Sequence, residues 1–442
     1  MKTQISNKEI WSIALPIMLG NMAQTIINFT DTAFLGRLGV IALGASMLAG
    51  LFYFVFTTIA TGFAIGIQII IARRFGEGNH GRIGVIFQHG SIFVLILGLI
   101  LFSILYIFSD HLLLWLIDSP NIYDASLEYI KYRQFGIIFV CFNFLYRALY
   151  VGISNTKVIT YSTVIMAVVN IFLDYCLIFG NFGFPEMGIG GAALASFCAE
   201  VSAFTFFTVY SYITLRNKDY GMFKLHRLES ELMGRILKLA TPTMIQKLFS
   251  FSVWFIFFIL IEKMGETATG ISSIVRSVYM ILITPCFAFA TTTNTVVSRI
   301  IGEGHSDQVF STINKILKNC LLCTIPIMIL VAIFPIQIAR IYTDDLNLAQ
   351  LVVPSIYVIC FGTIFQGIGN AYFEAVSGTG NTSAALYLEA VILVIYVAFI
   401  WAMTHLTTRV ELVWTAEILY GTLLGLFCII YIKFAKWDKK RI

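Results

Sequence analysis

The feature that most limits the fold of this chain is a succession of apolar stretches, each long enough to cross a membrane. A helix needs about 20 mostly apolar residues to span the hydrocarbon core. Windows of that length predict twelve spans, at 10–34, 44–72, 84–108, 127–150, 158–180 and 189–214, then at 236–260, 269–298, 316–340, 350–375, 384–404 and 410–434. The sequence therefore predicts an all-α membrane protein.

The composition agrees with lipid as the main solvent. Only 12% of the 442 residues are charged and 58% are hydrophobic, whereas soluble domains carry about 25% charged residues. A soluble enzyme is excluded, because no single soluble core of this length could hide so much apolar surface. The eight cysteines are scattered in apolar runs. Only Cys320 and Cys323 are close together, and they have no His or acidic companions. This indicates buried hydrophobic residues rather than disulfides or a metal site.

The distribution of Lys and Arg predicts the orientation in the membrane. With the N-terminus placed in the cytoplasm, the inner segments contain nineteen basic residues and the outer segments contain four. Basic residues accumulate on the cytoplasmic side of membrane proteins. We therefore expect an integral protein of the cytoplasmic (inner) membrane, with both termini in the cytoplasm. The net charge of +5 reflects this topology and does not indicate nucleic acid.

The chain also matches itself when it is shifted by 226 residues. The matching pairs include Pro16 with Pro242, Gly76-Glu77-Gly78 with Gly302-Glu303-Gly304, and Asn155-Thr156 with Asn381-Thr382. One offset holds without a gap from residue 14 to residue 161, which indicates a duplication. We expect an N-terminal six-helix lobe at 1–214, a cytoplasmic linker at 215–235 and a C-terminal six-helix lobe at 236–442.

Six spans in each copy give both copies the same topology, so a pseudo-twofold axis along the membrane normal should relate the two six-helix bundles. Parallel repeats of this kind are a transporter architecture, with the substrate bound between the halves and access that alternates between the two sides. The plainer alternative is that the duplication only builds a larger helical bundle.

Several of these features together resemble a known family. They are the two six-helix halves, the proline in the first span, and two turns, Arg73-Arg74-Phe75-Gly76-Glu77-Gly78 after span two and Ser377-Gly378-Thr379-Gly380-Asn381-Thr382 after span ten. The whole chain resembles the multidrug and toxic compound extrusion (MATE) family. The resemblance implies a monomeric exporter of amphipathic, often cationic compounds, which works by Na⁺ or H⁺ antiport through rocker-switch alternating access.

Two carboxylates of the first half lie where lipid makes an ionisable group costly, by about 2.5–3.5 kcal/mol at a helix centre. Asp31 and Asp174 each lie toward the outer end of an outward-running span, and Asn170 precedes Asp174 by one helical turn. Their oxygens suit Na⁺ as a ligand set, whereas two desolvated carboxylates that repel each other could instead hold a proton. The alternative is that both aspartates cap helix ends among the lipid headgroups.

The resemblance assigns a role to these positions. In one branch of the family the coupling aspartate follows the span-one proline by fifteen residues, as Asp31 follows Pro16. The same branch has Asn-x-x-x-Asp in span five, matched by Asn170 and Asp174, and a small hydroxyl residue in span six, for which Ser196 is the match.

The repeat provides a control for this assignment. At the offset of 226, Asp31 becomes Phe257 and Asp174 becomes Ile400, so only one copy carries the acidic residues. The other branch of the family has a glutamate in span seven, and the stretch after Pro242 contains no acid. We therefore expect cation coupling in the N-terminal lobe.

Pro16 and Pro242 interrupt backbone hydrogen bonding in the first span of each copy. The resemblance implies that the first of these spans bends with the ion state of the aspartate. A static kink is the alternative.

The second half has its own polar residues inside spans, namely Gln246, Lys247, Arg276, Glu389 and Glu417. The two cations and two carboxylates could pair with one another and only support packing. In the alternative interpretation these side chains contact the substrate. Arg147 and Glu374 lie near the cytoplasmic ends of spans four and ten, where they could pair as an inner gate or simply solvate two helix ends.

Other functions fit the residues less well. The six His lie at span ends or in links, which gives no catalytic or haem site in the bilayer, and the sequence has no G-x-x-x-x-G-K-[ST] loop for ATP. We expect no enzyme and no cofactor beyond the transported ion, with drug-like molecules and membrane lipids as partners. A lipid or oligosaccharide flippase of the same superfamily is the nearest alternative, and a channel is another.

Overall fold

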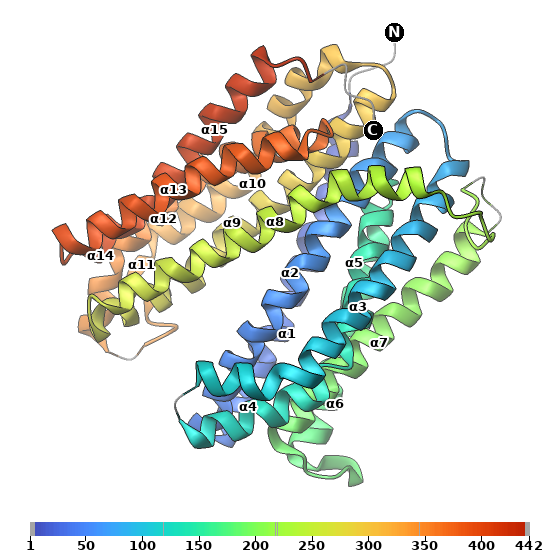
Figure 1. Ribbon diagram of the computed structural model, residues 1–442. Helices are drawn as coiled ribbons and strands as arrows, with labels where there is room; N and C mark the ends of the chain where they lie inside the picture. Colours follow the sequence, from blue (N-terminus) through green and yellow to red (C-terminus); the bar gives the residue numbers. More distant parts are fainter. Residues whose placement is uncertain (1–4, 118, 217, 219, 344, 438–442) are drawn as a thin grey trace. The chain divides into compact units, whose positions relative to one another are not determined.

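The computed structural model describes residues 5–437, except residues 118, 217, 219 and 344. Its described part consists of helices joined by short connections and contains no strand (Figure 1). In the first half the helices are α1 (Asn7–Leu38), α2 (Val40–Gly76), α3 (Gly81–Leu116), α4 (Pro120–Arg133), α5 (Gly136–Gly152), α6 (Lys157–Phe179) and α7 (Gly188–Leu215). In the second half they are α8 (Ser230–Glu262), α9 (Glu266–Gly302), α10 (Val309–Ile333), α11 (Pro335–Ala339), α12 (Leu346–Gly378), α13 (Thr382–Leu406), α14 (Val410–Trp414) and α15 (Ala416–Phe434).

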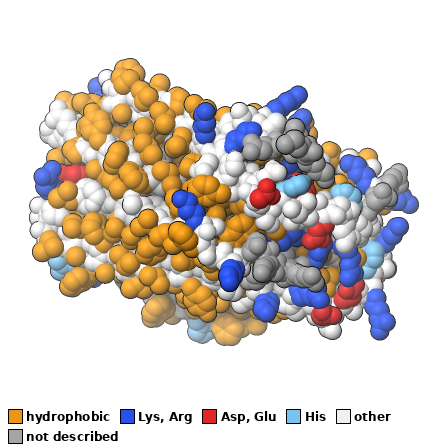
Figure 2. Space-filling model, turned by 90° about the horizontal axis from the view of Figure 1, so that it is seen from above, with side chains coloured by type: hydrophobic (Ala, Val, Ile, Leu, Met, Phe, Trp, Pro, Cys, Tyr) orange, Lys and Arg blue, Asp and Glu red, His pale blue; other side chains and the backbone are white. Residues whose placement is uncertain are grey.

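The number of membrane-length helices agrees with the prediction. Within the described residues, eleven helical segments are long and apolar enough to cross a membrane, and α4 with α5 passes the same test as a pair that is bent by 56°. Counting the bent pair as one span gives twelve, so the predicted all-α fold with twelve spans is confirmed. Large apolar side chains such as Ile107, Leu114 and Trp115 of α3 are exposed, and Figure 2 shows hydrophobic side chains over much of one face. Lipid is the solvent that such a surface requires.

The helices pack into two compact units. The first, here called the N-terminal unit, runs from Leu19 to Met244, and the C-terminal unit combines the described residues up to Met18 with the chain from Ile245 onward. The two divisions lie 226 residues apart, and each follows a proline, Pro16 or Pro242, by two residues. The boundaries differ from the lobes predicted at 1–214 and 236–442, because α1 and α8 each contribute to both units.

The first turns of α1 pack within the C-terminal unit. The Trp11 ring meets the edge of Phe289 at a centroid distance of 5.3 Å, and its indole N–H donates to Asn319 Oδ1 at 2.8 Å. Glu9 forms an ion pair with Arg299 at 2.5 Å. These contacts explain why residues before Met18 belong to this unit.

The first turns of α8 pack within the N-terminal unit in a corresponding way. The Thr243 hydroxyl donates to the carbonyl oxygen of Gly62 at 2.6 Å. A methyl group added at Gly66 would come within 2.7 Å of the Ala240 Cα, so glycine allows the two helix backbones to approach. Close backbone packing therefore holds this segment of α8 in place.

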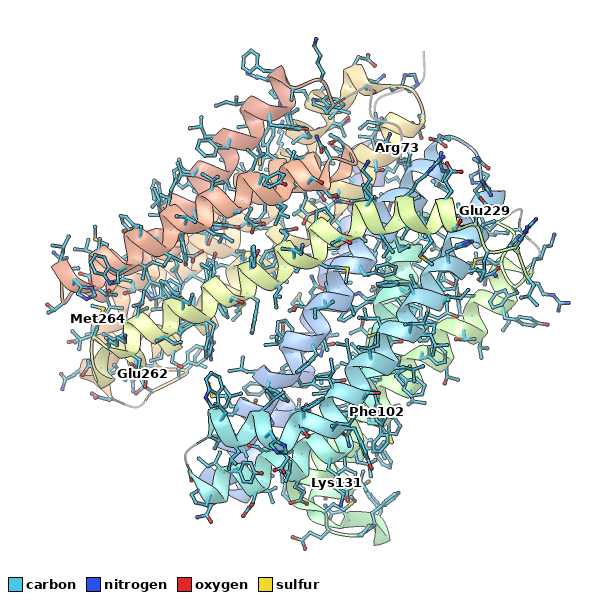
Figure 3. The ribbon with its side chains drawn as sticks, in the orientation of Figure 1. Arg73, Phe102, Lys131, Glu229, Glu262 and Met264 are labelled. Atoms are coloured by element: carbon cyan, nitrogen blue, oxygen red, sulfur yellow. The ribbon has the colours of Figure 1, made fainter. Side chains whose placement is uncertain are left out.

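The described part of the linker also packs on the N-terminal unit. Gln88 of α3 and the backbone of His226 exchange two hydrogen bonds of 2.9 Å. Arg82 pairs with both carboxylate oxygens of Glu229, at 2.6 and 3.2 Å. Figure 3 labels Glu229 where the linker meets the start of α8. Helix α8 begins at Ser230, so the linker between helices is shorter than the predicted 215–235.

Candidate functional site

Asp31, Asn170 and Asp174 lie together in the N-terminal unit. Asp31 belongs to α1, whereas Asn170 and Asp174 lie one turn apart on the same side of α6. The carboxyl groups of Asp31 and Asp174 are direct neighbours, and the side chain of Asn170 adjoins Asp31. Asn170 and Asp174 are buried and Asp31 is half-buried. We call these three residues the aspartate cluster.

The aspartate cluster contains polar atoms without hydrogen-bond partners among the described residues. These buried atoms are Asp31 Oδ1, both side-chain polar atoms of Asn170 and both carboxylate oxygens of Asp174. An unsatisfied buried polar group costs about 1–3 kcal/mol, and a charged group costs more. Most of these atoms are oxygens, so a proton or a hard cation would satisfy them.

A second charged group, which the sequence analysis did not predict, lies beside the aspartate cluster. Arg133, the last residue of α4, forms an ion pair with Glu200 of α7, and its guanidinium lies 4.2 Å from the centre of the Tyr53 ring. Both side chains are largely buried, and Arg133 also attracts the Asp31 carboxylate. Arg133 therefore lies in the electrostatic field of two carboxylates.

Glycine at position 136 makes room for this ion pair. A methyl group there would collide with Glu200 Oε2 and come within 2.8 Å of Arg133 Nη1. Gly136 is the first residue of α5, directly after the break from α4. The space for the ion pair is therefore provided by the glycine that begins α5.

Glu200 could have been found from the sequence, because it lies inside the predicted span 189–214 and every charge in a span requires an explanation. Ser196 lies one turn earlier in α7 and is half-buried. Among the described residues, no hydrogen bond or ion pair joins Ser196 to the aspartate cluster. The structure therefore brings together three of the four predicted coupling residues and adds Arg133 and Glu200 beside them.

Glu417 of α15 is surrounded by neutral hydrogen-bond donors in the C-terminal unit. Tyr396 donates to Oε1 at 2.7 Å, while Tyr279 and Gln366 donate to Oε2 at 2.7 and 2.8 Å. These donors come from α13, α9 and α12, so a single carboxylate connects four helices. This arrangement supports the packing interpretation for Glu417.

Glu389 of α13 forms a second buried carboxylate site in the same unit. Ser250 and Tyr420 both donate to its Oε1 at 2.7 Å. The side chain of Gln246 also adjoins this carboxylate, and the positive charge of the Lys247 ammonium attracts it. Lys247 Nζ lies 3.8 Å from Glu374 Oε1, and Asn294 donates to Glu374 Oε2 at 2.9 Å.

The two predicted arginines have different surroundings. Arg276 lies over the ring of Phe258 at 5.4 Å and has no ion pair among the described residues of its unit. Arg147 donates to Asn21 Oδ1 at 3.3 Å within the N-terminal unit. Because Arg147 and Glu374 belong to different units, their predicted pairing as an inner gate stays a prediction.

A comparison with family models identifies both halves of the chain. The model described as MatE matches residues 16–176 and again residues 242–402. Both matches begin at one of the prolines and are offset by 226 residues, which agrees with the internal repeat.

Curated relatives and solved structures agree with this match. The probable multidrug resistance protein NorM of Thermotoga maritima is 28% identical over 379 residues, which cover 85% of this chain and 80% of that relative. The multidrug resistance protein NorM of Photobacterium profundum is 24% identical, with coverage of 78% and 75%. A structure of a multidrug resistance MATE family transporter in an outward-facing conformation has the same fold, with a TM-score of 0.89 at 20% identity over 98% of this chain and 97% of that one. The chain therefore belongs to the MATE family, whose members are integral membrane transporters and not enzymes.

Proposed function

We propose that this protein exports amphipathic, often cationic organic compounds by antiport of H⁺ or Na⁺ at the aspartate cluster. The observation that carries the proposal is the group of buried polar atoms without partners at Asp31, Asn170 and Asp174. Such a group is costly unless a proton or cation satisfies it for part of a transport cycle. The relatives named multidrug resistance protein support the class of exported compound.

The charge of the aspartate cluster would set the conformation of α1. A bound proton or Na⁺ neutralises part of the repulsion between Asp31 and Asp174, and its release restores that repulsion. Helix α1 passes from one compact unit to the other after Met18, and Asp31 lies thirteen residues further along the same helix. We infer that ion binding acts through α1 to bias rocker-switch alternating access, with Pro16 as the point of bending.

We place the protein in the cytoplasmic (inner) membrane as a monomer, with both termini in the cytoplasm. The nineteen basic residues of the inner segments support this orientation. The bacterial relatives support the cytoplasmic membrane as the location. The transported H⁺ or Na⁺ is the only ion required, and lipids surround the exposed apolar helices. No nucleic-acid partner is part of the proposal.

Transport in proteoliposomes under an imposed gradient tests the function. Efflux of a fluorescent cationic dye is followed with a pH gradient, with a Na⁺ gradient and with neither. We expect one of the two gradients to drive uphill efflux and Asp31→Asn to abolish it. The variant Asp124→Asn, which makes the same change at an exposed position of α4, is the matched control and should transport normally. Full gradient-driven efflux by Asp31→Asn would falsify coupling at this cluster.

A further inference from the structure

The two buried glutamates of the C-terminal unit differ in how their oxygens are satisfied. Both Glu417 oxygens accept hydrogen bonds, and all three donors are neutral. Both oxygens of Glu417 are therefore occupied, which leaves no place for a further ligand.

Glu389 differs, because only one of its two carboxylate oxygens accepts hydrogen bonds within the part of the chain that the structure describes. Its Oε1 accepts from Ser250 and Tyr420, but Oε2 is buried and has no hydrogen-bond partner among the described residues. The side chain is only 2% exposed. One oxygen of this buried carboxylate is thus left without a hydrogen bond and can take up a proton or another small ligand.

Neighbouring groups on three helices determine what that ligand can be. On α8, Gln246 adjoins the carboxylate and Lys247 places an ammonium near it, while on α15 Tyr420 and Cys428 face it. From α12, Glu374 lies 3.8 Å from Lys247. Lys247 is therefore a single cation placed between two carboxylates.

These surroundings suit a proton better than a metal cation. A sodium ion needs several oxygen ligands, and the nearby ammonium repels it. A proton needs only the one free oxygen, and the Gln246 amide can donate to the carboxylate or accept from the carboxylic acid. Lys247 can then neutralise the negative charge of Glu389 when Glu389 is ionised. When Glu389 is protonated, Lys247 can neutralise the charge of Glu374 instead.

We propose that Glu389 binds and releases a proton at Oε2, with Lys247 as its internal counter-ion, and so forms a second ion-exchange site in the half of the molecule that lacks the aspartate cluster. Uptake forms one O–H bond with a proton from water, and release returns that proton to water. The proton site stands by itself, and only its use during export rests on the proposed function.

Infrared difference spectroscopy tests this site directly. The full-length protein in lipid bilayers is compared at acidic and alkaline pH, and the absorption of protonated carboxyl groups is recorded. We expect Glu389→Gln to remove one pH-dependent carboxylic-acid component per molecule. Glu417→Gln is the matched control, because it makes the same change at a buried glutamate whose oxygens are satisfied, and it should leave that component in place. An unchanged spectrum for Glu389→Gln, or loss of the component in Glu417→Gln, overturns the proposal.

A second variant keeps the test decisive if Glu389→Gln does not fold. Ser250→Ala removes one hydrogen bond to Oε1 while Tyr420 still donates to the same atom. The component should persist in this variant, and the pH at which it disappears should change. An unaltered pH dependence counts against Glu389 as its source.

The result can be separated from the test of the aspartate cluster. The infrared component of Glu389 should be present in Asp31→Asn whether or not that variant transports. Loss of transport in Asp31→Asn with a normal Glu389 signal therefore supports both sites. An absent Glu389 signal with normal coupling at Asp31 rejects only this second site.

Discussion

Arg133 and Glu200 form an ion pair in the interior of the N-terminal unit, where neither charge is easily left alone. The side chains are 14% and 9% exposed. Breaking a buried pair by removing one partner costs about 3–5 kcal/mol, because an uncompensated charge remains. The pair is therefore a point at which a single substitution should have a large effect.

We expect Arg133→Met to lower the stability of the N-terminal unit by about 3–5 kcal/mol, and Glu200→Leu to have a similar effect. The double variant should lose less than either single variant, since no charge is left unpaired. Thermal unfolding of the four proteins in detergent checks this. Arg74→Gln, which breaks the more exposed pair with Glu77, is the control and should cost only about 0–1 kcal/mol. Equal losses at both sites would contradict the argument.

At this scale the sequence predicted the aspartate cluster but not the ion pair beside it. Asp31, Asn170 and Asp174 were found because charged residues are costly in a span and because the helical period brings Asn170 and Asp174 to one side of α6. Arg133 and Glu200 are 67 residues apart, and nothing in the local pattern of either span indicates its partner. Side-chain pairing over such a separation depends on the tertiary packing of α4 and α7.

Among the helices, the break between α4 and α5 should be sensitive to a small change of side chain. Gly136→Ala places a methyl group against Glu200 Oε2 and Arg133 Nη1. We expect this variant to lose stability by about 1–3 kcal/mol, as overpacking does. Gly50→Ala in α2 is the matched control, because no atom lies within 4 Å of the added group. Alanine favours a helix by about 1 kcal/mol, so the control should be neutral or stabilised when thermal unfolding is measured.

Hydropathy alone could not predict this break. The stretch 127–150 is a single span by composition, whereas the structure divides it into α4 and α5 with a bend of 56°. The sequence contains no proline at this point. The position of Glu200, which is set by α7, explains why a glycine fits at position 136.

The stability of the linker segment that packs beside α3 should depend on pH. The hydrogen bond from Arg82 holds the pKa of Glu229 below its ordinary value of 4.5. A carboxyl group with a lowered pKa stabilises the folded state above its ordinary pKa, and this contribution is lost as the pH falls through the folded value. We expect amide hydrogen exchange at residues 220–229, corrected for its intrinsic pH dependence, to accelerate below about pH 4.5. Glu229→Gln should exchange faster at neutral pH and lose most of that dependence.

For the whole molecule, the most informative prediction concerns the first turns of α1. Removing residues 2–18 takes away Glu9 and Trp11, which pack on Arg299, Phe289 and Asn319. Hydrogen exchange should therefore accelerate in α9 and α10, although both helices are distant from the deletion in the sequence. Helices α5 and α7 of the N-terminal unit should keep their protection. Faster exchange confined to α2–α7 would contradict the division into units.

The span number, the duplication and the family could be predicted from the sequence, because hydropathy, repeated residues and turn motifs are local or periodic signals. The division into units could not. A boundary between lobes was expected in the polar linker, where the composition changes. The compact units instead divide inside two apolar helices, after Pro16 and Pro242, at points where the hydropathy does not change.

The order of synthesis gives this exchange of helix segments a further consequence. Residues 5–18 leave the ribosome before the N-terminal unit, but the unit that receives them consists otherwise of the chain from Ile245 onward, which leaves after it. The N-terminal unit can close as soon as Met244 has emerged. Residues 5–18 must therefore wait for their partners in the C-terminal unit until the N-terminal unit has been made. The unit whose first segment is synthesised earlier is thus the one that is completed later.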